Sequence, residues 1–99
     1  MKMYVLVRDV VPVGFAVVGI AHAPLACYLK FKDDPEVKEW LSGPFNKTVC
    51  RVTDEEFELA KKVIDHVVIT ESRLDGHETV LAFKPRAEWP KHFKFYRLF

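Results

Sequence analysis

The chain has 99 residues, a formal net charge of +1, 49% hydrophobic residues and 29% charged residues. A chain of this length has room for one hydrophobic core, so we predict a single domain over residues 1–99. The composition is ordinary for a globular protein, which argues against disorder, and the small net charge excludes a strongly polybasic protein.

The charges are distributed unevenly along the chain. Residues 33–78 contain 12 acids and 6 bases, whereas residues 84–97 contain five bases and one acid. The final segment, 84–99, is therefore predicted to form a basic face or tail on an otherwise acidic domain.

The first predicted elements are a strand over residues 3–7, a turn at Pro12 and Gly14, and a helix over residues 15–30. The helix is apolar on nearly all sides, so we expect it to be a central one. Pro24 lacks the N–H that would bond the carbonyl of Ile20, which predicts a kink or a break there.

Residues 10–29 contain no Lys, Arg, Asp or Glu, and His22 is their single imidazole. A membrane span is disfavoured because Pro, Gly and an imidazole suit an isolated spanning helix poorly. A signal peptide is disfavoured because a strand and Asp9 stand where its apolar region would begin. Gly19 and Ala23 leave a flat strip where a helix or the sheet can approach closely.

The second half of the chain continues in a regular α/β order. The acids and proline of residues 33–36 are a typical helix start, and Thr53 with Glu56 form a capping box. We predict an α/β three-layer sandwich with a four-stranded mixed sheet, in the order β-α-α-β-α-β-β. The remaining elements are a helix that starts at residues 33–36 and runs to residue 41, a strand over Lys47–Val52, a helix over 54–64, and strands over 66–70 and 78–83. In the helix over 54–64, Phe57, Ala60 and Ile64 lie on one face.

Two cysteines, Cys27 and Cys50, have neither C-x-x-C spacing nor a histidine at ligand spacing. We therefore expect no metal site, and free buried thiols in a reducing cytoplasm. No glycine-rich phosphate loop or nucleotide fingerprint is present, so no cofactor is expected.

His22 is the first candidate site residue because it follows a strand, a turn and the start of an apolar helix. In an apolar pocket its charged form would be disfavoured, and the neutral ring could act as a general base. The alternative is a histidine at a helix surface without a chemical role.

The polar loop over residues 71–77 is the second candidate. The first and third strands can end at the same edge of the sheet, where pockets of open α/β sheets lie. Glu71 or Asp75 could then orient His22, and Arg73 could hold a phosphate or carboxylate. An ordinary solvated turn is the alternative, and Ser72 lacks the surroundings of a nucleophile.

The basic final segment interleaves cations with aromatic side chains, as RNA-binding surfaces do. Aromatic side chains that cover the sheet edge or a dimer contact are an equal alternative. The candidate RNA-binding residues are Arg73, Lys84, Arg86, Trp89, Lys91 and Lys94.

The order of these motifs resembles the archaeal/eukaryotic-type peptidyl-tRNA hydrolases over residues 2–86. The residues that carry the resemblance are Met3-Tyr4-Val5-Leu6-Val7-Arg8, Gly14, Ala21-His22-Ala23, Val49 to Val52 before Asp54-Glu55-Glu56, Leu59-Ala60-Lys61-Lys62 and Thr79-Val80-Leu81-Ala82-Phe83.

The resemblance implies cleavage of the ester that joins a peptide to the 3′ end of tRNA. It implies catalytic roles for His22, for Glu71 or Asp75, and for Thr79. The family places a lysine in the turn that opens the first helix, where this chain has Gly14 and Phe15.

Two functions follow as hypotheses. The first is a divergent hydrolase of peptidyl- or aminoacyl-tRNA esters. The second is a non-catalytic module on the same fold that binds RNA, a small molecule or a protein. Self-association into a homodimer is also expected, because an all-round apolar helix in so small a domain could complete its burial across a two-fold axis.

Overall fold

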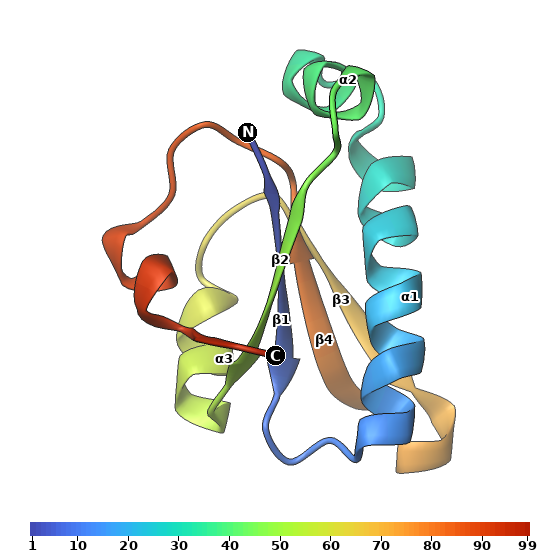
Figure 1. Cartoon of the computed structure of the whole chain (residues 1–99). Coiled ribbons are helices and arrows are strands. Elements are labelled where there is room, and N and C mark those ends of the chain that lie inside the picture. The colour runs from blue at the N-terminus through green and yellow to red at the C-terminus, as the bar shows by residue number, and fades with distance from the viewer.

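The computed structural model describes residues 1–99 and has a five-stranded mixed sheet in the order β3-β4-β1-β2-β5. Three helices complete the fold, which confirms the predicted α/β class (Figure 1). The bounds of the elements are β1 Met3–Arg8, α1 Val13–Phe31, α2 Pro35–Ser42, β2 Lys47–Val52, α3 Asp54–Ala60, β3 His66–Glu71, β4 His77–Phe83 and β5 Arg97–Leu98.

The strand directions bring distant parts of the sequence to one edge of the sheet. Strand β1 pairs parallel with β2 and antiparallel with β4, and β3 pairs antiparallel with β4. Strands β1 and β3 therefore run in the same direction and end at the same edge. The turn that follows β3 and the start of α1 can meet there, as the order of elements predicted.

The predicted count of four strands is wrong, because β5 forms a fifth. This strand has two residues, and Arg97 and Leu98 pair antiparallel with Arg51 and Cys50 of β2. The backbone N–H of Phe99 also donates to the carbonyl of Val49, at 2.8 Å. A strand is recognised in a sequence by the alternation of apolar and polar residues. Two residues are too few to show this alternation, so β5 could not be predicted.

Helix α1 lies on one face of the sheet and contacts β1, β3 and β4 (Figure 1). The prediction of a central helix is wrong, because α1 packs on the sheet with one face and leaves the other face exposed. The predicted close approach is confirmed, since small residues form the buried stripe. The buried residues are Ala16, Gly19, Ala23 and Cys27, and the exposed large residues are Val13, Val17, Val18, Leu25 and Leu29.

By length and composition α1 could also cross a membrane, with a mean hydropathy of 1.5. In this structure it is one layer of the domain. It runs through Pro24 without a break, because a missing N–H removes a single bond of a 19-residue helix. The expected self-association stays a prediction, and the exposed face of α1 is the surface that it would bury.

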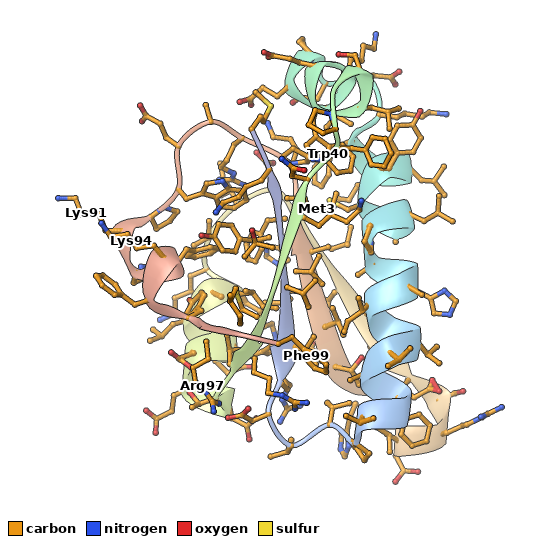
Figure 2. All side chains as sticks on the ribbon, viewed as in Figure 1. Met3, Trp40, Lys91, Lys94, Arg97 and Phe99 are labelled. Carbon is orange, nitrogen blue, oxygen red and sulfur yellow. The ribbon has the colours of Figure 1, made fainter.

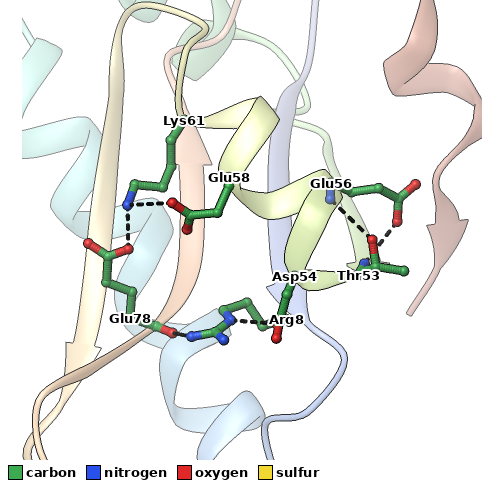
Figure 3. Close-up of polar contacts among 7 residues, drawn as sticks. All are labelled: Arg8, Thr53, Asp54, Glu56, Glu58, Lys61 and Glu78. Atoms are coloured by element: carbon green, nitrogen blue, oxygen red, sulfur yellow. Dashed lines mark hydrogen bonds and ion pairs between the residues drawn. The ribbon is translucent and has the colours of Figure 1, made fainter.

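The opposite face of the sheet carries α3 and the aromatic side chains of the final segment (Figures 1 and 2). Phe57 and Ala60 of α3 are fully buried there, together with Phe93. The predicted capping box is confirmed by bonds in both directions between Thr53 and Glu56 (Figure 3). The prediction that the helix reaches residue 64 is wrong, since α3 ends at Ala60 and the side chain of Ile64 is 72% exposed.

We predict that Gly19→Ala lowers the free energy of unfolding, because a Cβ at Gly19 would lie 2.6 Å from Cγ2 of Val80. Overpacking of this kind costs about 1–3 kcal/mol, against a gain in helix propensity of up to about 1 kcal/mol. Gly14→Ala is the matched control, because nothing lies within 4 Å of its Cβ position. Urea denaturation measures both, and a Gly19→Ala protein as stable as the Gly14→Ala protein would contradict the prediction.

Candidate functional site

A cavity of about 550 Å³ lies where the first turns of α1 meet the segment after β3. Helix α1 places one side of the cavity, and the turn between β3 and β4 places the other. Its lining combines an imidazole, a carboxylate and a guanidinium with two apolar side chains. The lining residues are Gly14, Phe15, Val18, His22, Glu71, Ser72 and Arg73.

His22 is exposed on the solvent side of α1, and its ring makes no hydrogen bond to the protein. The apolar, desolvated setting considered for it is therefore not the one that the structure shows. The sheet explains why, since the buried stripe of α1 is narrow and His22 lies beside it. An exposed ring is free to contact a substrate in the cavity, and nothing in the protein fixes its orientation.

Glu71, and not Asp75, shares the cavity with His22. Glu71 is the last residue of β3, so the strand sets its position. Asp75 lies three residues beyond Ser72 in a left-handed conformation with φ of 54°, and it is exposed. The turn is closed by a bond from the N–H of Gly76 to the carbonyl of Glu71, at 2.9 Å. The tight turn thus carries Asp75 past the cavity.

Thr79 lies beneath the cavity and is 1% exposed. Its Oγ1 donates a hydrogen bond to the carbonyl of Ile69, at 3.2 Å, across the β3–β4 pair. It lines a small recess beside the cavity together with Gly19 and His22. This placement suits a residue that supports the floor of the cavity.

A charged network ties α3 to the same end of the sheet (Figure 3). Arg8 Nε lies 2.9 Å from Asp54 Oδ1, and Arg8 Nη1 donates to the carbonyl of Glu78. Lys61 Nζ lies 2.6 Å from Glu78 Oε1 and 3.5 Å from Glu58 Oε1. The hydrogen bond to Asp54 raises the pKa of Arg8 and lowers that of Asp54. The network holds the start of β4, and with it Thr79, against β1.

A second cavity, of about 410 Å³, also reaches Thr79 and was not predicted from the sequence. Arg8, His77 and Glu78 line it together with Thr79. The one sequence feature that could have indicated this cavity is Arg8, a charged residue directly after the apolar residues 3–7. That signal is weak, because many strands end on a charged residue in solvent.

Lys84 is held inside the domain. Its Nζ lies 3.0 Å from both Asp34 Oδ2 and Glu36 Oε1, and 3.9 Å from Asp65 Oδ2. Burial lowers the pKa of Lys84, but the hydrogen bonds to Asp34 and Glu36 outweigh it and raise the pKa above its ordinary value. A buried cation that is neutralised by three carboxylates is unavailable to an RNA phosphate, so Lys84 leaves the candidate RNA-binding set.

Trp89 packs against the sheet, where its ring is half-buried among other aromatic rings. It stacks on Phe93 with centroids 5.4 Å apart, and meets Tyr4 edge-on at 4.7 Å. The guanidinium of Arg86 covers it at 4.8 Å from the centroid. Its faces are therefore occupied, and the structure gives Trp89 the role of a platform for Arg86.

The other candidate cations of the final segment point into solvent. Lys91 and Lys94 are exposed on the outer side of the segment (Figure 2). Arg73 is exposed at the rim of the His22 cavity. The candidate cations thus lie in four places, and they form no single basic tail. Lys84 is inside the domain, Arg86 lies on Trp89, Lys91 and Lys94 are on the outer side of the final segment, and Arg73 is at the rim of the His22 cavity.

The structure is thus an α/β domain with a mixed sheet and a cavity at its strand-turn-helix corner. Residues 1–90 match the family described as peptidyl-tRNA hydrolase PTH2. The chain therefore belongs to the peptidyl-tRNA hydrolase PTH2 family, which suggests a peptidyl-tRNA hydrolase-like function. No curated protein matches the chain at a significant level.

The ion pairs of Lys84 predict an acid-sensitive stability. The hydrogen bond from Lys84, aided by one from the N–H of Glu36, lowers the pKa of Asp34. A depressed folded-state pKa contributes stability above the unfolded value of about 3.9, and the contribution is lost as the pH falls through the folded pKa. We expect Asp34→Asn, which can still cap α2, to be less stable than the wild type at pH 7 and to lose less stability between pH 5 and pH 2.

Urea denaturation across this pH range measures the effect. Asp33→Asn is the control, because Asp33 is an exposed neighbour without an ion pair. Equal pH dependence of the two variants would contradict the prediction.

Proposed function

We propose that this protein hydrolyses the ester that joins a peptidyl or aminoacyl group to the 3′ end of tRNA. Family membership supports the reaction class. The observation that carries the proposal is the shared lining of one open cavity by His22 and Glu71, which lie 49 positions apart in the sequence. Two free buried thiols fit a cytoplasmic protein.

In the proposed reaction a water molecule attacks the ester carbonyl carbon while the neutral imidazole of His22 accepts its proton. The carboxylate of Glu71, which lines the same cavity, stabilises the charge of the imidazolium. The tetrahedral intermediate then expels the 3′ oxygen of the ribose, which takes the proton back from His22. The products are a free carboxylic acid and a tRNA with a 3′ hydroxyl group.

Arg73 supplies the cation of the proposed site. The turn that opens α1 carries Gly14 and Phe15 where the resemblance leads one to expect a lysine. Arg73 lines the cavity from the other wall, so its guanidinium can face a terminal phosphate or the developing oxyanion. Thr79 acts as a positioning residue through its bond to the β3 backbone.

The alternative is a binding module without turnover on the same fold. Phe15 and Val18 favour it, because they make part of the cavity lining apolar. Such a module would retain affinity for RNA or another ligand in the absence of hydrolysis, and the assay below separates the two functions.

We expect His22→Ala to lower kcat/KM for peptidyl-tRNA by roughly 10²–10⁴-fold, the usual contribution of a general base. Glu71→Gln should lower it as well, because the amide stabilises the imidazolium less. Asp75→Asn is the matched control: it makes the same change in charge within the same loop, outside the cavity, and asparagine tolerates the left-handed conformation. Hydrolysis of labelled peptidyl-tRNA by the purified proteins measures the effect.

Equal, background-level hydrolysis by the wild type and His22→Ala would remove the proposed activity and leave the binding module. Equal losses in Glu71→Gln and Asp75→Asn would remove the specific role of Glu71.

A further inference from the structure

A third cavity, of about 460 Å³, lies at the opposite end of the sheet from His22. It lies where β1 and β2 begin and where the chain passes after β4. Three cations and no carboxylate line it. The polar and aromatic lining residues are Lys2, Asn46, Lys47, Thr48, Arg86 and Trp89.

Backbone pairing brings the three cations of this cavity together from distant parts of the sequence. Lys2 and Arg86 form an isolated antiparallel bridge, and Met3 pairs with Lys47 in the parallel β1–β2 ladder. Paired residues in a sheet lie about 5 Å apart between Cα atoms. The sheet itself therefore sets the spacing of the charges.

Aromatic rings and backbone carbonyls, and not carboxylates, hold the three cationic groups. Lys47 Nζ donates to the carbonyl of Phe45 at 3.0 Å, and Arg86 Nη2 donates to that of Ile64 at 2.8 Å. Lys2 Nζ lies 4.7 Å from the centroid of Tyr4, and Arg86 Cζ lies 4.8 Å from that of Trp89. Lys47 Nζ lies 4.8 Å from the centroid of Phe45. Ring faces orient a cation without neutralising its charge.

Three cations elsewhere in the domain differ in this respect. Arg8, Lys61 and Lys84 each have an ion pair within 4 Å, whereas Lys2, Lys47 and Arg86 have none. Like charges held together without a counter-ion repel one another, and a bound anion would relieve that repulsion. Asn46 and Thr48 add polar groups that can bond to anion oxygens.

We propose that this cavity binds a phosphate group of an RNA chain, with Lys2, Lys47 and Arg86 as its ligands. The identity of the RNA as a tRNA rests on the proposed function, whereas the phosphate chemistry does not. Strand β1 has six residues at about 3.3 Å each, so the cavity lies roughly 20 Å from the end of the sheet that carries His22. The site would hold the RNA body while its 3′ end occupies the His22 cavity.

The first test measures the affinity for deacylated tRNA as a function of salt concentration. We expect Lys2→Gln/Lys47→Gln to weaken binding by on the order of tenfold at low salt, and to reduce the slope of log K against log salt by roughly two. Lys32→Gln/Lys38→Gln is the matched control, because it removes the same charge from exposed lysines that do not line the cavity. Equal losses in both variants would overturn the proposal.

The second test separates a free phosphate from an RNA phosphate by following the two indole N–H signals in NMR spectra. Trp89 lines the cavity, and the indole N–H of Trp40 donates to the carbonyl of Asn46 at 2.9 Å. Both signals should shift with added inorganic phosphate and with tRNA in the wild type, and shift less in Lys2→Gln/Lys47→Gln. Shifts with inorganic phosphate but unchanged tRNA affinity in that variant would overturn the assignment to RNA.

The proposed hydrolysis and the proposed phosphate site can each be overturned without the other. His22→Ala should lower kcat/KM for peptidyl-tRNA and keep the wild-type slope of log K against log salt for deacylated tRNA, because it removes none of the three cations. Lys2→Gln/Lys47→Gln should raise KM for peptidyl-tRNA and leave kcat unchanged. A fall in kcat with unchanged KM would overturn the assignment of this cavity to RNA binding.

Discussion

The contact between the small-residue stripe of α1 and the sheet is the constraint on which the rest of the structure depends. Gly19 lets the helix come so close to β4 that a Cβ would collide with Val80. This approach positions the first turns of α1 against the end of β3, and so brings His22 and Glu71 to one cavity. It also leaves the larger side chains of α1 outside, because the stripe alone fits against the sheet.

Ion pairs hold both ends of the sheet, and one group of cations lies outside them. At the end that carries His22, Arg8 and Lys61 are each paired with carboxylates, and these pairs hold β1, β4 and α3 together. At the opposite end, Lys84 is paired with Asp34 and Glu36. Lys2 and Arg86 lie at the same end, where they rest on aromatic rings without an ion pair.

The basic and aromatic residues of the final segment, 84–99, contribute mainly to the packing of the domain. Its aromatic residues pack on the sheet: Phe93 is 1% exposed, and Trp89 meets Tyr4 and Phe83 edge-on. One of its cations, Lys84, forms ion pairs with Asp34 and Glu36 inside the domain. Basic and aromatic residues do alternate in this segment. Most of the aromatic side chains, however, pack on the sheet and are not free to stack on nucleotides.

The sequence by itself determined the α/β class, the positions of most elements and the polar loop after β3, because these depend on local periodicity, caps and turns. It left open whether Glu71 or Asp75 shares a cavity with His22, and it led us to expect a central helix for α1 and to miss β5. Only the tertiary structure decided these points, because they depend on which face a helix turns to the sheet and where a tight turn ends. The same holds for Lys2, Lys47 and Arg86, whose grouping arises from strand pairing between residues up to 84 positions apart.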